Sequence, residues 1–219
     1  AGIGAALLSY VHGTSKVAIA DGVGDYAFYV SDHWAGTVTP SKATHTFAPA
    51  SKTYTDITSD LSDEDYMATL ITYTISGNTG VGFTFLYFGS NENVTSDENG
   101  DYSLSVPAGW SGTVYAIKSG YRFTPTYYSY YNVQSDVQNQ DFIAERLYTI
   151  SGNAGIPAVT LSYVENGVSK TTVSYGSGSY SFQVPEHWSG TVVPSKTDYV
   201  FNPDSRSYSD IQADQTLQD

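Results

Sequence analysis

Four histidines are the side chains best suited to acid, base or metal chemistry: His12, His33, His45 and His187. No two of them have the H-x-x-x-H or HExxH spacing of a zinc site, and the chain has no cysteine to complete one. His33 and His187 each precede a tryptophan, whereas Gly109 precedes the third. Serine is abundant, yet no nucleophile elbow with suitably ordered partners is present. The sequence therefore predicts a protein that is not an enzyme.

An acidic segment offers the best candidate cofactor site, because calcium prefers clustered oxygen ligands. Its carboxylates are Asp60, Asp63, Glu64 and Asp65. The segment lacks the EF-hand pattern, and a similar segment later in the chain keeps only Asp136 and Asp141. A solvated acidic loop is the competing interpretation. Calcium is thus the only cofactor that the sequence suggests, and no other is expected.

Three lysines, Lys42, Lys118 and Lys196, recur at one position of an internal repeat. A recurring lysine invites the idea of an isopeptide crosslink, which requires a neighbouring Asn and a catalytic carboxylate. The alternative is a lysine whose stem packs on an aromatic face while its head stays in water. The second interpretation is favoured because Asn78 and Asn153 have no partner near the start of the chain.

Composition narrows the class of protein. The 219 residues carry a formal charge of −13, which argues against nucleic-acid binding because phosphates require clustered Lys and Arg. No apolar run is long enough to span a bilayer. Charged residues make up 14% and aromatic residues 15% of the chain, a balance typical of secreted β-rich proteins. We therefore expect an extracellular or cell-surface location.

An internal repeat dominates the sequence. Trp34, Trp110 and Trp188 each stand in a W-[AS]-G-T-V motif, first 76 and then 78 residues apart. Equal offsets relate many other positions, and the sequence divides into a first copy (1–65), a second copy (66–141) and a third copy (142–219). The positions predicted to form the core of each copy are its recurring aromatic residues. They are Trp34, Trp110, Trp188, Tyr26, Tyr102, Tyr180, Phe47, Phe123 and Phe201.

Short stretches within each copy alternate polar and apolar residues, as in Tyr102–Val106, which indicates half-buried strands. Turn residues such as Glu165-Asn166-Gly167 separate them. No stretch shows a convincing helical period. About seven strands per copy predict an all-β chain of three tandem Ig-like or transthyretin-like β-sandwiches of about 75 residues each. Apolar linkers between copies are expected to pack between neighbours through Tyr66, Met67, Leu70, Phe142 and Ile143.

Tyrosines that do not recur are better candidates for surface contact. Tyr127, Tyr128 and Tyr131 cluster in the second copy, and tyrosine combines rigid contact area with a polar tip. They predict an interface or a glycan-binding face. A strand with one aromatic face is the alternative.

The motifs resemble those of a known family. Y-T-I-S-G-N, then G-x-Y-x-[FL]-x-V-P-x-x-W-[SA]-G-T-V-x-P-S-K and D-Q-T-x-Q-D, are similar to the carboxypeptidase regulatory-like repeats of bacterial secreted and surface proteins. The resemblance implies a noncatalytic transthyretin-like sandwich used as a stalk, spacer or adhesion module. It points to no particular activity.

The phase of the repeat suggests how the protein assembles. Ala1-Gly2-Ile3 aligns with Ala154-Gly155-Ile156, so the first copy has no counterpart of the preceding Y-T-I-S-G-N strand. We expect an unpaired edge or groove there, open to another strand. The predicted function is a subunit or segment of a surface fibre or adhesive stalk, joined head to tail by strand donation or by covalent continuation. The alternative is a carbohydrate-binding or spacer module of a larger secreted hydrolase.

Overall fold

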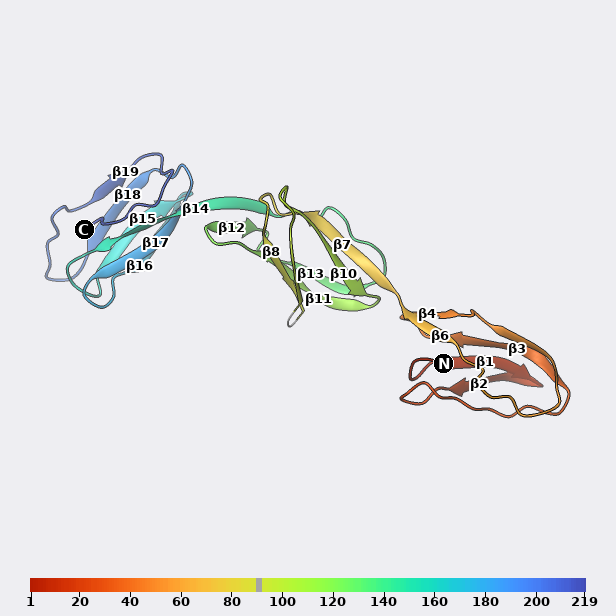
Figure 1. The fold of residues 1–219 in the computed structure, drawn as a ribbon. Coiled ribbons are helices and arrows are strands. Elements are labelled where there is room, and N and C mark those ends of the chain that lie inside the picture. Colours follow the sequence, from red (N-terminus) through yellow and green to blue (C-terminus); the bar gives the residue numbers. More distant parts are fainter. Residues whose placement is uncertain (90–91) are drawn as a thin grey trace. The chain divides into compact units, whose positions relative to one another are not determined.

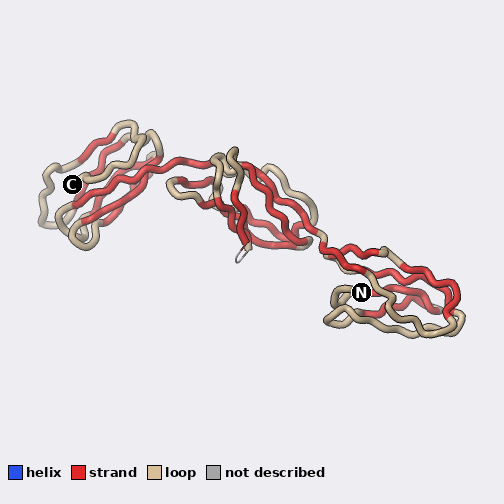
Figure 2. Tube along the Cα trace, viewed as in Figure 1, coloured by secondary structure: helices blue, strands red, loops and turns tan. Residues whose placement is uncertain are grey.

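The computed structural model describes residues 1–89 and 92–219, in which all regular elements are strands (Figures 1 and 2). The all-β class predicted from the alternating patterns is confirmed. In this described part of the chain, no helix is long and apolar enough to cross a membrane.

The described residues form two compact units. The first comprises residues 1–76, 103–113 and 129–140, and the second comprises residues 77–102, 114–128 and 141–219. Four strands contribute residues to both units: β7 (Thr72–Asn78), β10 (Asp101–Pro107), β11 (Trp110–Ile117) and β13 (Tyr128–Val133). The threefold division of the sequence remains a proposal.

The first unit contains a four-stranded antiparallel sheet in the order β2-β1-β3-β5. Its strands are β1 (Leu7–His12), β2 (Thr14–Ile19), β3 (Trp34–Ser41) and β5 (Lys52–Ile57). A separate antiparallel pair joins β4 (His45–Ala48) to β6 (Met67–Leu70). Strand β6 lies after residue 65, where the first copy ends in the sequence. It nevertheless pairs with β4, a strand of the first copy.

The shared strands form two sheets. One pairs β10 with β7, and the other has the order β13-β11-β8-β9. The two remaining strands of the second sheet are β8 (Phe85–Phe88) and β9 (Glu92–Thr95). Alternation along β10 places Tyr102, Leu104 and Val106 in the core, as the period of two in the sequence predicts.

The second unit contains a four-stranded sheet, β16-β15-β18-β19, and a three-stranded sheet, β12-β14-β17. The strands are β12 (Tyr121–Thr124), β14 (Ile143–Asn153), β15 (Thr160–Glu165), β16 (Val168–Val173), β17 (Ser179–Pro185), β18 (Gly190–Ser195) and β19 (Arg206–Tyr208). Strand β14 pairs with β12 through residues 143–146 and with β17 through residues 147–153. The turn between β15 and β16 uses Asn166 and Gly167 at φ 51° and 78°, the conformation predicted from this dipeptide.

The recurring aromatic residues line the cores. Trp34, Trp188, Tyr102, Tyr180 and Phe123 are buried, whereas Trp110, Tyr26, Phe47 and Phe201 are half-buried. Two indole N–H groups donate to main-chain carbonyls of an adjacent strand or its end, Trp34 to Val11 and Trp188 to Val164, both at 2.9 Å. A buried indole satisfied in this way can anchor the sandwich without an unpaired donor.

The glycine of the W-[AS]-G motif has a packing role. A Cβ atom at Gly36, Gly112 or Gly190 would lie 2.3 to 2.5 Å from the Cζ2 atom of the preceding tryptophan. Real Cβ atoms do not approach that closely, so the indole ring can lie over the strand only if this residue is glycine. The motif therefore reflects packing rather than chemistry.

Replacing Gly190 with alanine is expected to lower the free energy of unfolding by about 1 to 3 kcal/mol, because Trp188 must leave its rotamer or the backbone must shift. Chemical denaturation followed by tryptophan fluorescence measures the change. Gly22→Ala is a suitable control, since a Cβ there would meet nothing within 4 Å. Equal effects of the two substitutions would contradict the packing explanation.

Candidate functional site

The strand of the Y-T-I-S-G-N motif occupies the same environment in the second and third copies. Its isoleucines, Ile75 and Ile150, are completely buried. Ile150 pairs antiparallel with Phe182 on β17 and forms a parallel bridge with Gln215. Ile75 forms the equivalent parallel bridge with Val137. Each strand is thus held along both of its edges.

Aspartates fix the two ends of these strands. The carboxylates of Asp136 and Asp214 accept the N–H groups of Thr74 and Thr149, both at 2.8 Å. A second pair, Asp141 and Asp219, accepts the N–H groups of Asn78 and Asn153 at 2.8 and 2.7 Å. The four bonds use equivalent residues in the two copies, so they form a repeated docking arrangement for one strand.

The first copy presents the same two edges without a strand between them. Residues 26–30, the counterpart of β10 and β17, are not part of a sheet. Within the described ranges, 1–89 and 92–219, neither residues 26–30 nor residues 58–65 make a backbone-to-backbone hydrogen bond. The counterparts of the docking aspartates are Asp60 and Asp65. An extended peptide could therefore pair on both sides.

A cavity of about 720 Å³ lies between these edges. We call it the groove, and it is lined by Ala1, residues 25–32, Trp34, Tyr54 and residues 57–65. At one end, the Ala1 amino group donates to Gly24 O at 2.5 Å. The N–H groups of Thr79 and Ala154 make the corresponding bonds to Gly100 and Gly178. Thr79 and Ala154 are the residues that directly follow the two Y-T-I-S-G-N strands.

Burial of the apolar side chains marks the same position. Tyr26, Phe28 and Val30 are only half-buried. Their counterparts are almost completely covered: Tyr102, Leu104 and Val106 are 5%, 0% and 1% exposed, and Tyr180, Phe182 and Val184 are 5%, 8% and 0% exposed. The groove therefore has an apolar floor that a strand carrying an isoleucine would cover.

The acidic segment predicted as a calcium site forms one wall of the groove. Glu64 accepts hydrogen bonds from Lys52 at 2.9 Å and from Tyr54 at 2.8 Å. Across residues 1–89 and 92–219, no three Asp, Glu or His side chains come together in a way that could hold a metal ion. Calcium binding by Asp60, Asp63, Glu64 and Asp65 remains an untested prediction. The counterparts of Asp60 and Asp65 suggest strand docking instead.

The Glu64 carboxylate is expected to make the stability of the first copy depend on pH. Hydrogen bonds from Lys52 and then from Tyr54 hold its pKa below the ordinary value of 4.5. A lowered folded-state pKa adds stability above the unfolded pKa, and that stability is lost as pH falls through the folded value. We expect Glu64→Gln to flatten the loss of stability below about pH 4.5. Denaturation midpoints measured from pH 6 to 3 check this, and parallel curves for both proteins would contradict it.

The linker residues separate into two groups. Tyr66 and Phe142 are each 2% exposed and lie in a core, whereas their packing between neighbouring copies remains a prediction. The expectation that Met67, Leu70 and Ile143 pack between copies is wrong, since they are 71%, 47% and 71% exposed. Met67 and Leu70 stand three residues apart on β6, so they point to opposite faces of the β4–β6 pair and are exposed on both. Ile143 is exposed at the start of β14, where it pairs with Thr124 of β12.

The tyrosine cluster also divides. Tyr127 and Tyr131 are 56% and 91% exposed. Tyr128 instead packs edge-on against Phe142, with ring centroids 5.1 Å apart, and its hydroxyl donates to Asp141 O. A single surface platform of Tyr127, Tyr128 and Tyr131 is therefore not formed, because Tyr128 covers the core.

The recurring lysines share one contact. The ammonium groups of Lys42 and Lys196 donate to the main-chain carbonyls of Gly4 at 2.6 Å and Pro157 at 2.5 Å, and Lys118 donates to that of Gly82. A lysine held by a carbonyl ties a loop to the sandwich. This contact supplies a structural reason for the repeated residue that needs no crosslink.

Comparison with known proteins gives a likeness of fold. No protein-family model and no curated protein matches the chain. A solved structure of the Bacillus anthracis TIE protein aligns with 98% of this chain, at 11% identity and a TM-score of 0.51. The chain spans only 46% of that protein. A streptococcal ancillary pilin aligns with 99% of this chain and 92% of its own length, at 8% identity and a TM-score of 0.36.

Proposed function

We propose that this chain is a noncatalytic structural part of a bacterial secreted or cell-surface protein, built from three tandem β-sandwiches. Its first sandwich accepts a strand of the Y-T-I-S-G-N type, and this joins it head to tail to further repeats. Such repeats belong to separate subunits of a fibre or to one continuous stalk. The groove carries the proposal.

Strand addition explains the chemistry of the groove. Unpaired N–H and C=O groups at a sheet edge bind an extended peptide through main-chain hydrogen bonds, while pockets select its side chains. By equivalence with the other copies, the isoleucine of the incoming strand covers Phe28 and Val30. Its threonine and asparagine N–H groups donate to Asp60 and Asp65. The sequence read by the groove is thus the one that the chain itself contains twice.

The wider setting is supported by composition and fold. An acidic chain without cysteine, in which recurring aromatic residues form the cores, suits a secreted β-protein. The carboxypeptidase regulatory-like motifs and the shared fold of the Bacillus anthracis TIE protein both agree with a bacterial protein of tandem sandwiches. Electron microscopy of native material distinguishes filaments of separate subunits from single stalks.

A peptide with the sequence of residues 146–153 tests the groove. We expect it to raise the melting temperature and to slow amide exchange at residues 26–30 and 58–65, because it binds only the folded state. Exchange in β1 and β2 should change little. The control peptide carries Asp in place of the isoleucine, and the variant Asp60→Ala with Asp65→Ala should bind the original peptide more weakly. Unchanged exchange at both edges would refute the proposal.

Carbohydrate binding is the second candidate function, favoured by the exposed rings of Tyr131 and Tyr127, which are 91% and 56% exposed. Aromatic faces bind sugars by stacking. A glycan array comparing the protein with Tyr131→Ala separates the two functions, since strand acceptance by residues 1–65 does not involve this tyrosine. Binding that is lost in the variant would support an accessory module of a larger enzyme.

A further inference from the structure

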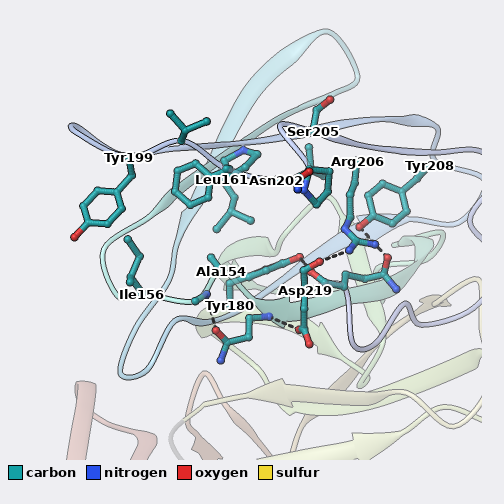
Figure 3. Close-up of a pocket in the computed structure, with 18 residues that line it drawn as sticks. Ala154, Ile156, Leu161, Tyr180, Tyr199, Asn202, Ser205, Arg206, Tyr208 and Asp219 are labelled. Carbon is teal, nitrogen blue, oxygen red and sulfur yellow. Dashed lines mark hydrogen bonds between the residues drawn. The ribbon is translucent and has the colours of Figure 1, made fainter.

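A second cavity, of about 400 Å³, lies within residues 153–219. We call it the C-terminal pocket. Tyr180, Val192, Phe201 and Arg206 line it, together with Gly155 and Asp219 (Figure 3). In the other two copies, a side chain lies among the counterparts of Tyr180, Val192 and Phe201.

That side chain is an aromatic ring from the residue after the last aspartate of the copy. The ring centroids of Tyr66 and Tyr26 are 6.3 Å apart, and the Tyr66 hydroxyl donates to Val38 O. The ring centroid of Phe142 lies 6.3 Å from those of Tyr102 and Phe123. The counterparts of Tyr26, Val38 and Phe123 in the third copy are Tyr180, Val192 and Phe201. The C-terminal pocket is therefore lined by the residues that hold Tyr66 and Phe142 elsewhere.

Three equivalent glycines give independent evidence. All have positive φ, at 72°, 70° and 78° for Gly2, Gly80 and Gly155. A Cβ atom on Gly2 would lie 2.8 Å from Tyr66 O, and one on Gly80 would lie 3.2 Å from Phe142 O. A Cβ on Gly155 would meet nothing within 4 Å. Gly155 thus retains a surface that fits the backbone of a passing strand.

An unpaired segment borders the pocket. Residues 45–48 pair with 67–70, and residues 121–124 pair with 143–146, each antiparallel. Their counterparts, residues 199–202, belong to no strand, and Val200 is 97% exposed. An incoming segment that enters the pocket would lie beside residues 199–202 and could pair with them.

Arg206 adds a preference for an aromatic ring. The residue at this position faces the ring in both other copies: Lys52 Nζ lies 5.5 Å above Tyr66, and Tyr128 contacts Phe142. In the third copy, the Arg206 guanidinium lines the pocket and donates to Asp219 O. A guanidinium at the edge of an apolar cavity favours a ring through a cation–π contact.

We propose that the C-terminal pocket binds the leading aromatic residue of an extended polypeptide strand, a Phe or Tyr followed by residues that pair antiparallel with residues 199–202. The C-terminal pocket would recognise the features that Phe142–Arg146 shows in the second copy, an aromatic ring followed by a segment that pairs as a strand. This site is on residues 153–219 and does not depend on the groove of the first copy.

The test extends the chain by Phe-Ile-Ala-Glu-Arg after Asp219, as this segment follows Asp141 in the second copy. The matched control extends it by Ala-Ile-Ala-Glu-Arg. We expect the Phe extension to slow amide exchange at residues 199–202 at least about tenfold relative to the control, because burial of the ring stabilises the pairing. Arg206→Met should reduce that difference without abolishing it.

The outcomes are separable from those for the groove. Protection confined to residues 199–202 and their neighbours supports the proposal, whatever the Y-T-I-S-G-N peptide does at residues 26–30. Equal exchange with the Phe and Ala extensions overturns the proposal, whether both extensions protect residues 199–202 or neither does. In either case, the ring would not be the recognised group.

Discussion

Replacing Phe142 with alanine is expected to lower the free energy of opening of β12 and of the residues of β14 paired with it by about 3 to 5 kcal/mol. The ring is 2% exposed and lies between Tyr102, Phe123 and Tyr128. Its removal leaves a cavity that strands fixed by hydrogen bonds cannot close. The loss would be large beside the total stability of a small domain.

Native-state hydrogen exchange at β12 and β14 measures this effect and resolves it from the rest of the chain. Ile143→Ala is the matched control, because the neighbouring side chain is 71% exposed and surface truncations change stability by at most about 0.5 kcal/mol. A loss of less than about 1 kcal/mol for Phe142→Ala would show that the ring is not a closing element of the core.

Ile150→Ala is expected to cost about 2 to 5 kcal/mol. The side chain is fully buried in a cluster with Leu161, Phe182, Val184 and Val192. It is also the residue that the groove in the first copy should select from an incoming strand. The same truncation in the free peptide should therefore weaken binding to the groove, which links a stability measurement to the proposed function.

Chemical denaturation of the full chain quantifies the Ile150 effect, and Val168→Ala is its control, since Val168 is 60% exposed. If both substitutions have the same small effect, the Y-T-I-S-G-N segment of β14 contributes little to the stability of the core around Ile150. Strand acceptance by the groove would then lose its energetic basis.

Much of the fold could be predicted because it depends on local patterns. Alternation in Tyr102–Val106 marks β10, and Asn166-Gly167 marks the turn after β15. The groove could be anticipated as well, since the motif Y-T-I-S-G-N stands at residues 73–78 and 148–153 but has no counterpart within residues 1–65. Period and turn chemistry act over a few residues, so one sequence is enough to detect them.

Long-range pairing could not be predicted in this way. The partner of Asp136 is the N–H of Thr74, 62 residues earlier, and nothing in an acidic loop distinguishes such an acceptor from a calcium ligand. One signal was present, because Asp60 and Asp65 recur in every copy whereas Asp63 and Glu64 do not. For Met67 and Ile143, the error was one of orientation, since an apolar linker that becomes a strand buries only alternate side chains.

Strand β14 has a consequence for dividing the protein into pieces. Its first four residues complete the sheet edge at β12, and its last seven residues lie against β17. The second and third sequence copies therefore overlap in the structure, because residues 143–146 pair with β12 of the second copy and residues 147–153 pair with β17 of the third. A fragment that starts at residue 142 takes this segment from the preceding module, and one that ends there withholds it from the next. An autonomous excised module should carry two such segments, one at each end.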